Sequence, residues 1–83
     1  MIKVLLFGRL SDLHDESELQ LEWQDELADL RKLAEKISAN HGQLNREFEN
    51  PQTLISVNQT LVTWDYSISD GDEIAFLPPV TGG

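Results

Sequence analysis

The residues with the most distinctive chemistry stand at the end of the sequence, which reads Pro79-Val80-Thr81-Gly82-Gly83. Glycine has no side chain, so a pair of glycines fits a channel that larger residues would block. The reactive group at the tip is the Gly83 carboxylate, which becomes an acyl donor once a mixed anhydride with AMP provides a leaving group. Sulfur could then displace AMP and leave a thiocarboxylate. We expect an extended tail, and this chemistry follows from it only if a partner supplies ATP, the sulfur source and the active site.

The other residues that could do chemistry indicate structural roles. The chain has no cysteine, which excludes thiol nucleophiles, cysteine-ligated zinc, iron–sulfur clusters and disulfides. His14 and His41 lack the spacing of metal ligands, and we interpret them as surface or capping residues. Asp70, Asp72 and Glu73 stand in a segment too short for an EF-hand, and a turn explains them. We expect no bound metal, no bound cofactor and no nucleophile–base pair, so the chain should not be an enzyme by itself.

Charge and composition limit the classes of partner. The chain has 83 residues, enough for one small domain, and a formal net charge of −9. Such a chain repels phosphate backbones and anionic lipids, so we expect no nucleic-acid or membrane binding and favour a partner with a basic face. The absence of cysteine, of a signal-peptide pattern and of a long apolar stretch predicts a cytoplasmic protein. The strongly acidic segment 12–29 is either a solvated loop with an edge strand or a docking face.

Hydrophobic periodicity predicts five strands and one main helix. Alternation and β-branched residues favour strands at residues 2–7, 19–23, 54–57, 61–64 and 73–77. Apolar residues at helical spacing predict an amphipathic helix over residues 26–40, with Asp25 as its N-cap. A further helical turn is expected at residues 44–48, and a tight turn at residues 69–72.

A helix between two hairpins can bury its apolar face only by packing across one face of a mixed sheet. The favoured right-handed connection then places the first and last strands side by side and parallel. This arrangement is the α+β class with the β-grasp, or ubiquitin-like, architecture, in which one main helix covers one face of the sheet. We assign residues 1–78 to this domain and residues 79–83 to the tail, and we interpret Trp23 and Trp64 as core residues.

Two blocks of the sequence resemble a known family. Residues 57–62 read Val-Asn-Gln-Thr-Leu-Val, and residues 70–83 read Asp-Gly-Asp-Glu-Ile-Ala-Phe-Leu-Pro-Pro-Val-Thr-Gly-Gly. With the start Met-Ile-Lys-Val-Leu-Leu-Phe, these blocks resemble the small subunits of molybdopterin synthase, which are ubiquitin-like sulfur carriers. The resemblance spans the whole chain and is strongest toward its end.

The resemblance implies a function in molybdenum cofactor biosynthesis. An adenylating enzyme similar to the ubiquitin-activating enzymes would use ATP to activate Gly83, and a sulfurtransferase system would deliver sulfur to it. The thiocarboxylated tail would insert into the large subunit of a heterotetramer and donate sulfur to cyclic pyranopterin monophosphate, which becomes the molybdopterin dithiolene. Substrate-binding and acid–base residues would then belong to the large subunit, and this chain would be its sulfur-donating partner.

The family's apolar docking positions match Phe7, Leu61 and Leu77. Strand alternation supports this match, since Phe7 and Leu77 can fall on the sheet face that the helix leaves uncovered. A contiguous apolar area on that face would be a liability in a monomer and is typical of an interface. The alternative is that one or more of the three belongs to the core.

Three other functions remain open at this point. A sulfur carrier for thiamin thiazole synthesis also ends in Gly-Gly, although such carriers usually lack the Pro-Pro-Val-Thr stalk. A ubiquitin-like modifier would form isopeptide bonds to lysines of target proteins. A β-grasp adaptor would not need its tail at all.

Overall fold

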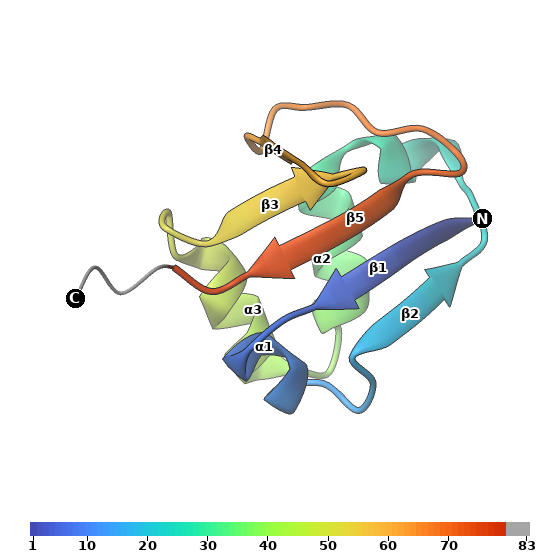
Figure 1. The fold of residues 1–83 in the computed structure, drawn as a ribbon. Coiled ribbons are helices and arrows are strands. Elements are labelled where there is room, and N and C mark those ends of the chain that lie inside the picture. Colours follow the sequence, from blue (N-terminus) through green and yellow to red (C-terminus); the bar gives the residue numbers. More distant parts are fainter. Residues whose placement is uncertain (80–83) are drawn as a thin grey trace.

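The computed structural model describes residues 1–79 and contains a mixed sheet with helices on one side (Figure 1). The elements follow one another in the order β1 (Ile2–Leu6), α1 (Arg9–Asp12), β2 (Glu18–Leu21), the 3₁₀ helix η1 (Asp25–Ala28), α2 (Leu30–Ser38), α3 (Gly42–Glu49), β3 (Leu54–Val57), β4 (Thr60–Val62) and β5 (Glu73–Leu77).

The five strands lie in the spatial order β2-β1-β5-β3-β4. The first and last strands are central neighbours and run parallel, with Val4 opposite Ile74 and Leu6 opposite Phe76. The other neighbours pair antiparallel. The predicted parallel pairing and the predicted β-grasp architecture are therefore confirmed.

The core lies between the inner face of the sheet and the helices. Along β1, Ile2, Val4 and Leu6 are buried while the residues between them are only partly buried, which is the period-two pattern of a strand with one covered face. The helix α2 presents an apolar stripe to the same space, and these stripe residues are buried: Leu30, Leu33, Ala34 and Ile37. In Figure 1 the helix α2 lies behind the sheet, so the opposite face of the sheet turns toward the viewer.

The predicted helix over residues 26–40 is divided in two, and the predicted N-cap at Asp25 is wrong. Asp29 caps α2, since its carboxylate accepts hydrogen bonds from the backbone N–H groups of Arg31 at 2.8 Å and Lys32 at 3.4 Å. The backbone of Asp29 is extended, with φ −87° and ψ 117°, because it forms a β-bridge with Ser67. This pairing with a distant loop interrupts the helix, and local periodicity does not record it.

Other differences concern the ends of elements. The expected helical turn at residues 44–48 is a full helix, α3, and the short helix α1 was not predicted. The strand expected at residues 61–64 is β4, which ends before Trp64. Trp23 and Trp64 are partly buried and pack against the core instead of lying within it. The tight turn expected at residues 69–72 is confirmed, with the N–H of Asp72 donating to the carbonyl of Ser69 at 3.1 Å.

Within residues 1–79, none of the helices combines the length and the apolar composition that a membrane crossing requires.

Candidate functional site

The chain leaves the domain from the central strand β5. Leu77 is the last residue of this strand, and the partly buried prolines Pro78 and Pro79 follow it. Pro78 lies against the connection between β1 and α1, where a Cβ atom added to Gly8 would come within 3.0 Å of Pro78 Cγ. Pro78, the last residue assigned to the domain, therefore packs on the connection that follows β1. Val80, Thr81, Gly82 and Gly83 lie outside the described residues, so the position of the Gly83 carboxylate stays a prediction.

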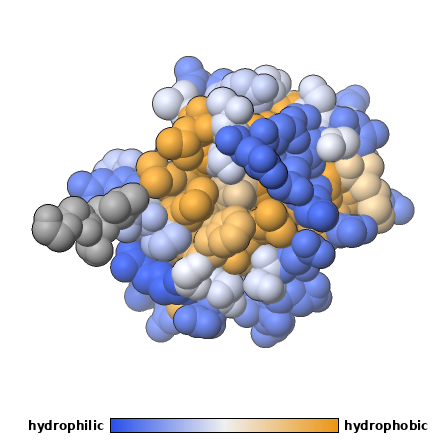
Figure 2. All heavy atoms as spheres, viewed as in Figure 1, coloured by the Kyte–Doolittle hydropathy of each residue, from blue (hydrophilic) through white to orange (hydrophobic). Residues whose placement is uncertain are grey.

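The uncovered face of the sheet carries an apolar patch beside this exit. The sequence-predicted residues Phe7 and Leu61 are 46 % and 65 % exposed, and Leu77 is partly buried. Strand register places further apolar side chains between them, because Ala75 pairs with both Leu5 and Ser56, and Ser56 pairs with Leu61. Alternation and register place six apolar residues on this face, of which Ala75 is buried and Leu5, Leu54 and Leu77 are partly buried. We define the apolar patch by these six residues: Leu5, Phe7, Leu54, Leu61, Ala75 and Leu77. Figure 2, which has the same view as Figure 1, shows hydrophobic side chains gathered on this face.

A charged row limits the apolar patch at the other end of the same face. The ammonium nitrogen of Lys3 lies 3.7 Å from a carboxylate oxygen of Glu18 and 3.9 Å from one of Glu73. Lys3 on β1 and Glu73 on β5 pair at the end of the sheet opposite Leu77, whereas Glu18 stands on the edge strand β2 opposite Leu5. Exposed ion pairs of this kind contribute little to stability. Their consequence here is a sheet face that is polar at one end and apolar at the end from which the tail leaves.

The two histidines form a contact that sequence spacing did not indicate. The rings of His14 and His41 stack with centroids 4.2 Å apart, and His41 Nε2 lies 3.6 Å from a carboxylate oxygen of Asp15. His41 is also the N-cap residue of α3, although its side chain makes no capping bond there. In the part of the chain that the structure describes, no group of three or more His, Asp and Glu residues is arranged to hold a metal ion.

The acidic residues of the turn at residues 69–72 bond to the protein itself. A carboxylate oxygen of Asp70 lies 2.5 Å from the amino-terminal nitrogen of Met1. Asp72 accepts hydrogen bonds from the N–H of Ser69 at 2.8 Å and from the side-chain amide of Asn58 at 3.0 Å. The interpretation of Asp70 and Asp72 as turn residues is therefore confirmed, whereas Glu73 is the first residue of β5.

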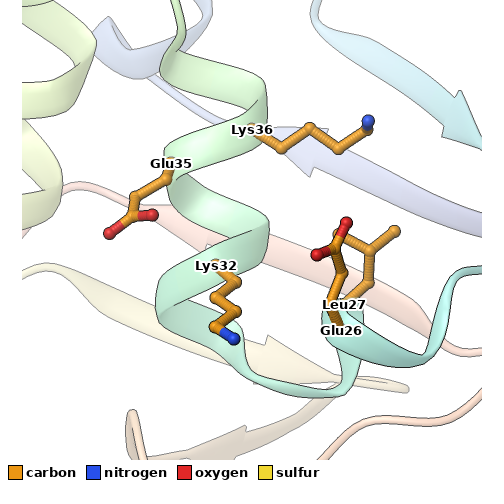
Figure 3. Close-up of a pocket in the computed structure, with 5 residues that line it drawn as sticks. All are labelled: Glu26, Leu27, Lys32, Glu35 and Lys36. Carbon is orange, nitrogen blue, oxygen red and sulfur yellow. The ribbon is translucent and has the colours of Figure 1, made fainter.

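A hollow of about 400 Å³ on the helical side does not resemble a binding site (Figure 3). Leu27 and four charged side chains line it, and these charges balance: Glu26, Lys32, Glu35 and Lys36. The hollow lies between η1 and α2, in the helical layer, whereas the apolar patch is on the opposite face of the sheet. We take the apolar patch, at the end of the sheet where β5 ends, as the candidate site.

The fold and the site together define a class: a β-grasp domain whose open sheet face is apolar beside the exit of a Gly-Gly tail. Comparison with known proteins agrees with this class. The model of the ThiS family matches residues 4–83. This chain belongs to the ThiS family.

Individual relatives share its full length. The chain is 38 % identical to the molybdopterin synthase sulfur carrier subunit of Escherichia coli and 35 % identical to that of Haemophilus influenzae, and each comparison covers 100 % of both chains. Among solved structures, it is similar to a putative molybdopterin converting factor, subunit 1, from Pyrococcus furiosus, with 33 % identity, a TM-score of 0.76 and coverage of 95 % and 97 %. It is also similar to a chain in the complex of subunits 1 and 2 of the molybdopterin-converting factor from Helicobacter pylori, with 25 % identity, a TM-score of 0.60 and coverage of 99 % and 97 %.

Proposed function

We propose that this chain is the sulfur carrier subunit of molybdopterin synthase and acts in molybdenum cofactor biosynthesis. The observation that carries the proposal is the full-length similarity to carriers of that name, together with a family match that runs to Gly83. The geometry supports the proposal, because the apolar patch includes Leu77, the last residue of the strand that leads to the tail. The chain acts as a partner subunit that carries sulfur, and the residues that bind the pterin belong to the large subunit.

The chemistry takes place at Gly83. An adenylating enzyme joins the Gly83 carboxylate to AMP from ATP and releases pyrophosphate. A sulfurtransferase system then supplies sulfide-level sulfur, which forms the carbon–sulfur bond while AMP leaves. The resulting thiocarboxylate donates its sulfur to cyclic pyranopterin monophosphate, and hydrolysis returns the carboxylate. Since each carrier delivers one sulfur, two loaded carriers are needed for one dithiolene.

The apolar patch is the docking surface for the large subunit in this proposal. Phe7, Leu61 and Leu77 supply its main contacts, and residues 79–83 insert into the active site of the large subunit. An exposed apolar area of this kind on a small acidic protein favours a partner that covers it. The structure of subunits 1 and 2 from Helicobacter pylori is a precedent for such an assembly in a similar protein. A heterotetramer located in the cytoplasm completes the proposal.

The proposal is tested by reconstitution. The chain is incubated with its cognate adenylating enzyme, ATP and a sulfur donor, and intact-mass spectrometry should detect the replacement of one oxygen by sulfur. The loaded carrier, mixed with the large subunit and cyclic pyranopterin monophosphate, should then produce the dithiolene. A chain truncated after Thr81 is the control and should do neither.

Three results would contradict the assignment. A dithiolene yield from the truncated chain equal to that of the full chain would show that the tail carries no sulfur. Transfer of sulfur to the thiazole precursor of thiamin but not to the pterin would assign the chain to thiamin synthesis. Isopeptide-linked conjugates on target lysines, with no pterin product, would instead identify a protein modifier.

A further inference from the structure

The two sequence blocks that carry the family resemblance meet at the tip of the β3–β4 hairpin. Asn58 and Gln59 form its two-residue turn, with φ angles of 51° and 70°. Two consecutive residues in the left-handed region produce a turn whose twist matches that of the strands. Asparagine enters this region more readily than most residues, so Asn58 suits the first position. The side chain of Asn58 points to a second role.

Three hydrogen bonds tie Asn58 to the beginning of β5. Its backbone N–H donates to the carbonyl of Glu73 at 2.8 Å, and its side-chain Oδ1 accepts from the N–H of Glu73 at 3.0 Å. Its Nδ2 donates to Oδ1 of Asp72 at 3.0 Å, and the other oxygen of Asp72 accepts from the N–H of Ser69 at 2.8 Å. The hairpin tip is therefore attached to the strand that leads into the tail.

Leu61 stands two residues after this turn. It lies on β4, a three-residue strand at the edge of the sheet that pairs with β3. Its side chain is 65 % exposed, so burial contributes little to holding it in place. Because β4 adjoins only one strand, the geometry of the hairpin determines how Leu61 stands relative to Ala75 and Leu77.

We propose that Asn58 is a positioning residue for docking. Through Asp72 and the backbone of Glu73 it holds the β3–β4 hairpin so that Leu61 is continuous with the rest of the apolar patch when the large subunit binds. The inference rests on the proposed function, since it concerns affinity for the large subunit. Asn58 itself is expected to act through Leu61 and not through substrate.

The first experiment is a double-mutant cycle on the dissociation constant for the large subunit. Asn58→Gly keeps the left-handed backbone and removes both side-chain hydrogen bonds, so it should weaken binding about fivefold. In the Leu61→Ala background the same change should alter affinity less than about twofold, because the residue through which Asn58 acts has gone. Asn40→Gly is the matched control: Asn40 is also an exposed asparagine in the left-handed region, with φ 66°, but it lies between α2 and α3 in the helical layer. This control should bind like the wild type.

The second experiment exchanges the side chains of Asn58 and Asp72. It tests whether the hydrogen bond between them, and not a general loss of stability, determines the affinity. Asn58→Asp places two carboxylates in contact and should weaken binding about fivefold or more. Adding Asp72→Asn restores an amide–carboxylate hydrogen bond in the reverse direction and should return the affinity to within about twofold of the wild type. Circular dichroism and melting curves establish that each variant is folded before its affinity is compared.

The outcomes separate this inference from the proposed function. If Leu61→Ala weakens binding but Asn58→Gly does not, or if the two losses multiply, Asn58 does not act through Leu61. An exchange variant that binds as poorly as Asn58→Asp overturns the inference as well. If neither Leu61→Ala nor Phe7→Ala weakens binding, the docking surface of the proposed function is itself wrong.

Discussion

Glycine at position 82 is the residue where a small change should have the largest functional effect. Gly82→Val introduces a β-branched side chain and restricts the backbone where, in our proposal, a channel of the large subunit admits only main chain. Dithiolene formation should fall to background, while the melting temperature stays that of the wild type. Single-turnover assays with the loaded carrier measure the first quantity and calorimetry the second.

A matched glycine on the domain controls for the loss of glycine itself. Gly42→Ala adds a Cβ at the beginning of α3, where nothing lies within 4 Å. This variant should keep full turnover. Equal turnover for Gly82→Val and the wild type would mean that no narrow channel surrounds the tail.

Phe7 is the largest exposed side chain of the apolar patch, at 46 % exposure. An aromatic anchor at the centre of an interface typically contributes about 2 kcal/mol to binding, so Phe7→Ala should raise the dissociation constant for the large subunit about thirtyfold. Because half of the ring is already in solvent, the free energy of unfolding should fall by no more than about 1 kcal/mol. Titration calorimetry measures the affinity, and urea denaturation measures the stability.

Tyr66 provides the comparison for Phe7, since it is an aromatic residue of similar exposure, 45 %, in the loop that pairs with Asp29 near the helices. Tyr66→Ala should leave affinity for the large subunit unchanged. If Phe7→Ala unfolds the chain and its folded fraction binds normally, Phe7 belongs to the core and the docking surface lies elsewhere.

At the scale of elements, the cap of α2 can be tested by comparing Asp29, which caps the helix in the structure, with Asp25, which the sequence predicted. The carboxylate of Asp29 accepts from two backbone N–H groups of the helix, whereas Asp25 accepts a hydrogen bond from the indole of Trp23 at 3.3 Å. Asp29→Ala should therefore lower the free energy of unfolding by about 1 kcal/mol, and Asp25→Ala by less than about 0.5 kcal/mol. Urea denaturation of both variants measures the difference, and equal losses would contradict the assignment of the cap.

The sheet shows why two faces of one element can have different functions. Each strand alternates its side chains, so β5 directs Ile74 and Phe76 into the core and Leu77 into the apolar patch. The aromatic ring of Phe76 packs against that of Phe48 on α3, with centroids 4.6 Å apart. The strand that leads to the tail is thereby anchored to the helical layer on one side and contributes on the other to the apolar patch, which is the docking surface in our proposal.

At the scale of the whole molecule, the net charge of −9 should govern how fast the chain meets a basic partner. Long-range attraction raises the association rate and is screened by salt, whereas contacts in the apolar patch are formed at short range. Raising the salt concentration from about 0.05 to 0.5 M should slow association about tenfold and change dissociation less than about twofold. Stopped-flow or surface plasmon resonance measures both rates, and a salt effect confined to dissociation would contradict the argument.

Much of this protein follows from its sequence because the determining signals are local. Strand alternation at β1, β3 and β5 and the turn at residues 69–72 depend on neighbouring residues and are found as predicted, and the apolar stripe of α2 is found within a shorter helix than predicted. The order of these elements leaves few ways to bury one helix on a sheet, so the parallel pairing of β1 with β5 followed as well. The tail chemistry at Gly83 also comes from the sequence and awaits its experiment.

Contacts between distant residues were decided only by the tertiary structure. Asp29 is extended because it pairs with Ser67, and this pairing moved the helix cap away from Asp25. The stacking of His14 on His41 and the bonds of Asn58 to Asp72 and Glu73 likewise join positions whose separation in sequence carries no periodic signal. Such contacts depend on how whole elements pack. Bringing two distant residues together costs loop-closure entropy, and the packing of the elements between them offsets this cost.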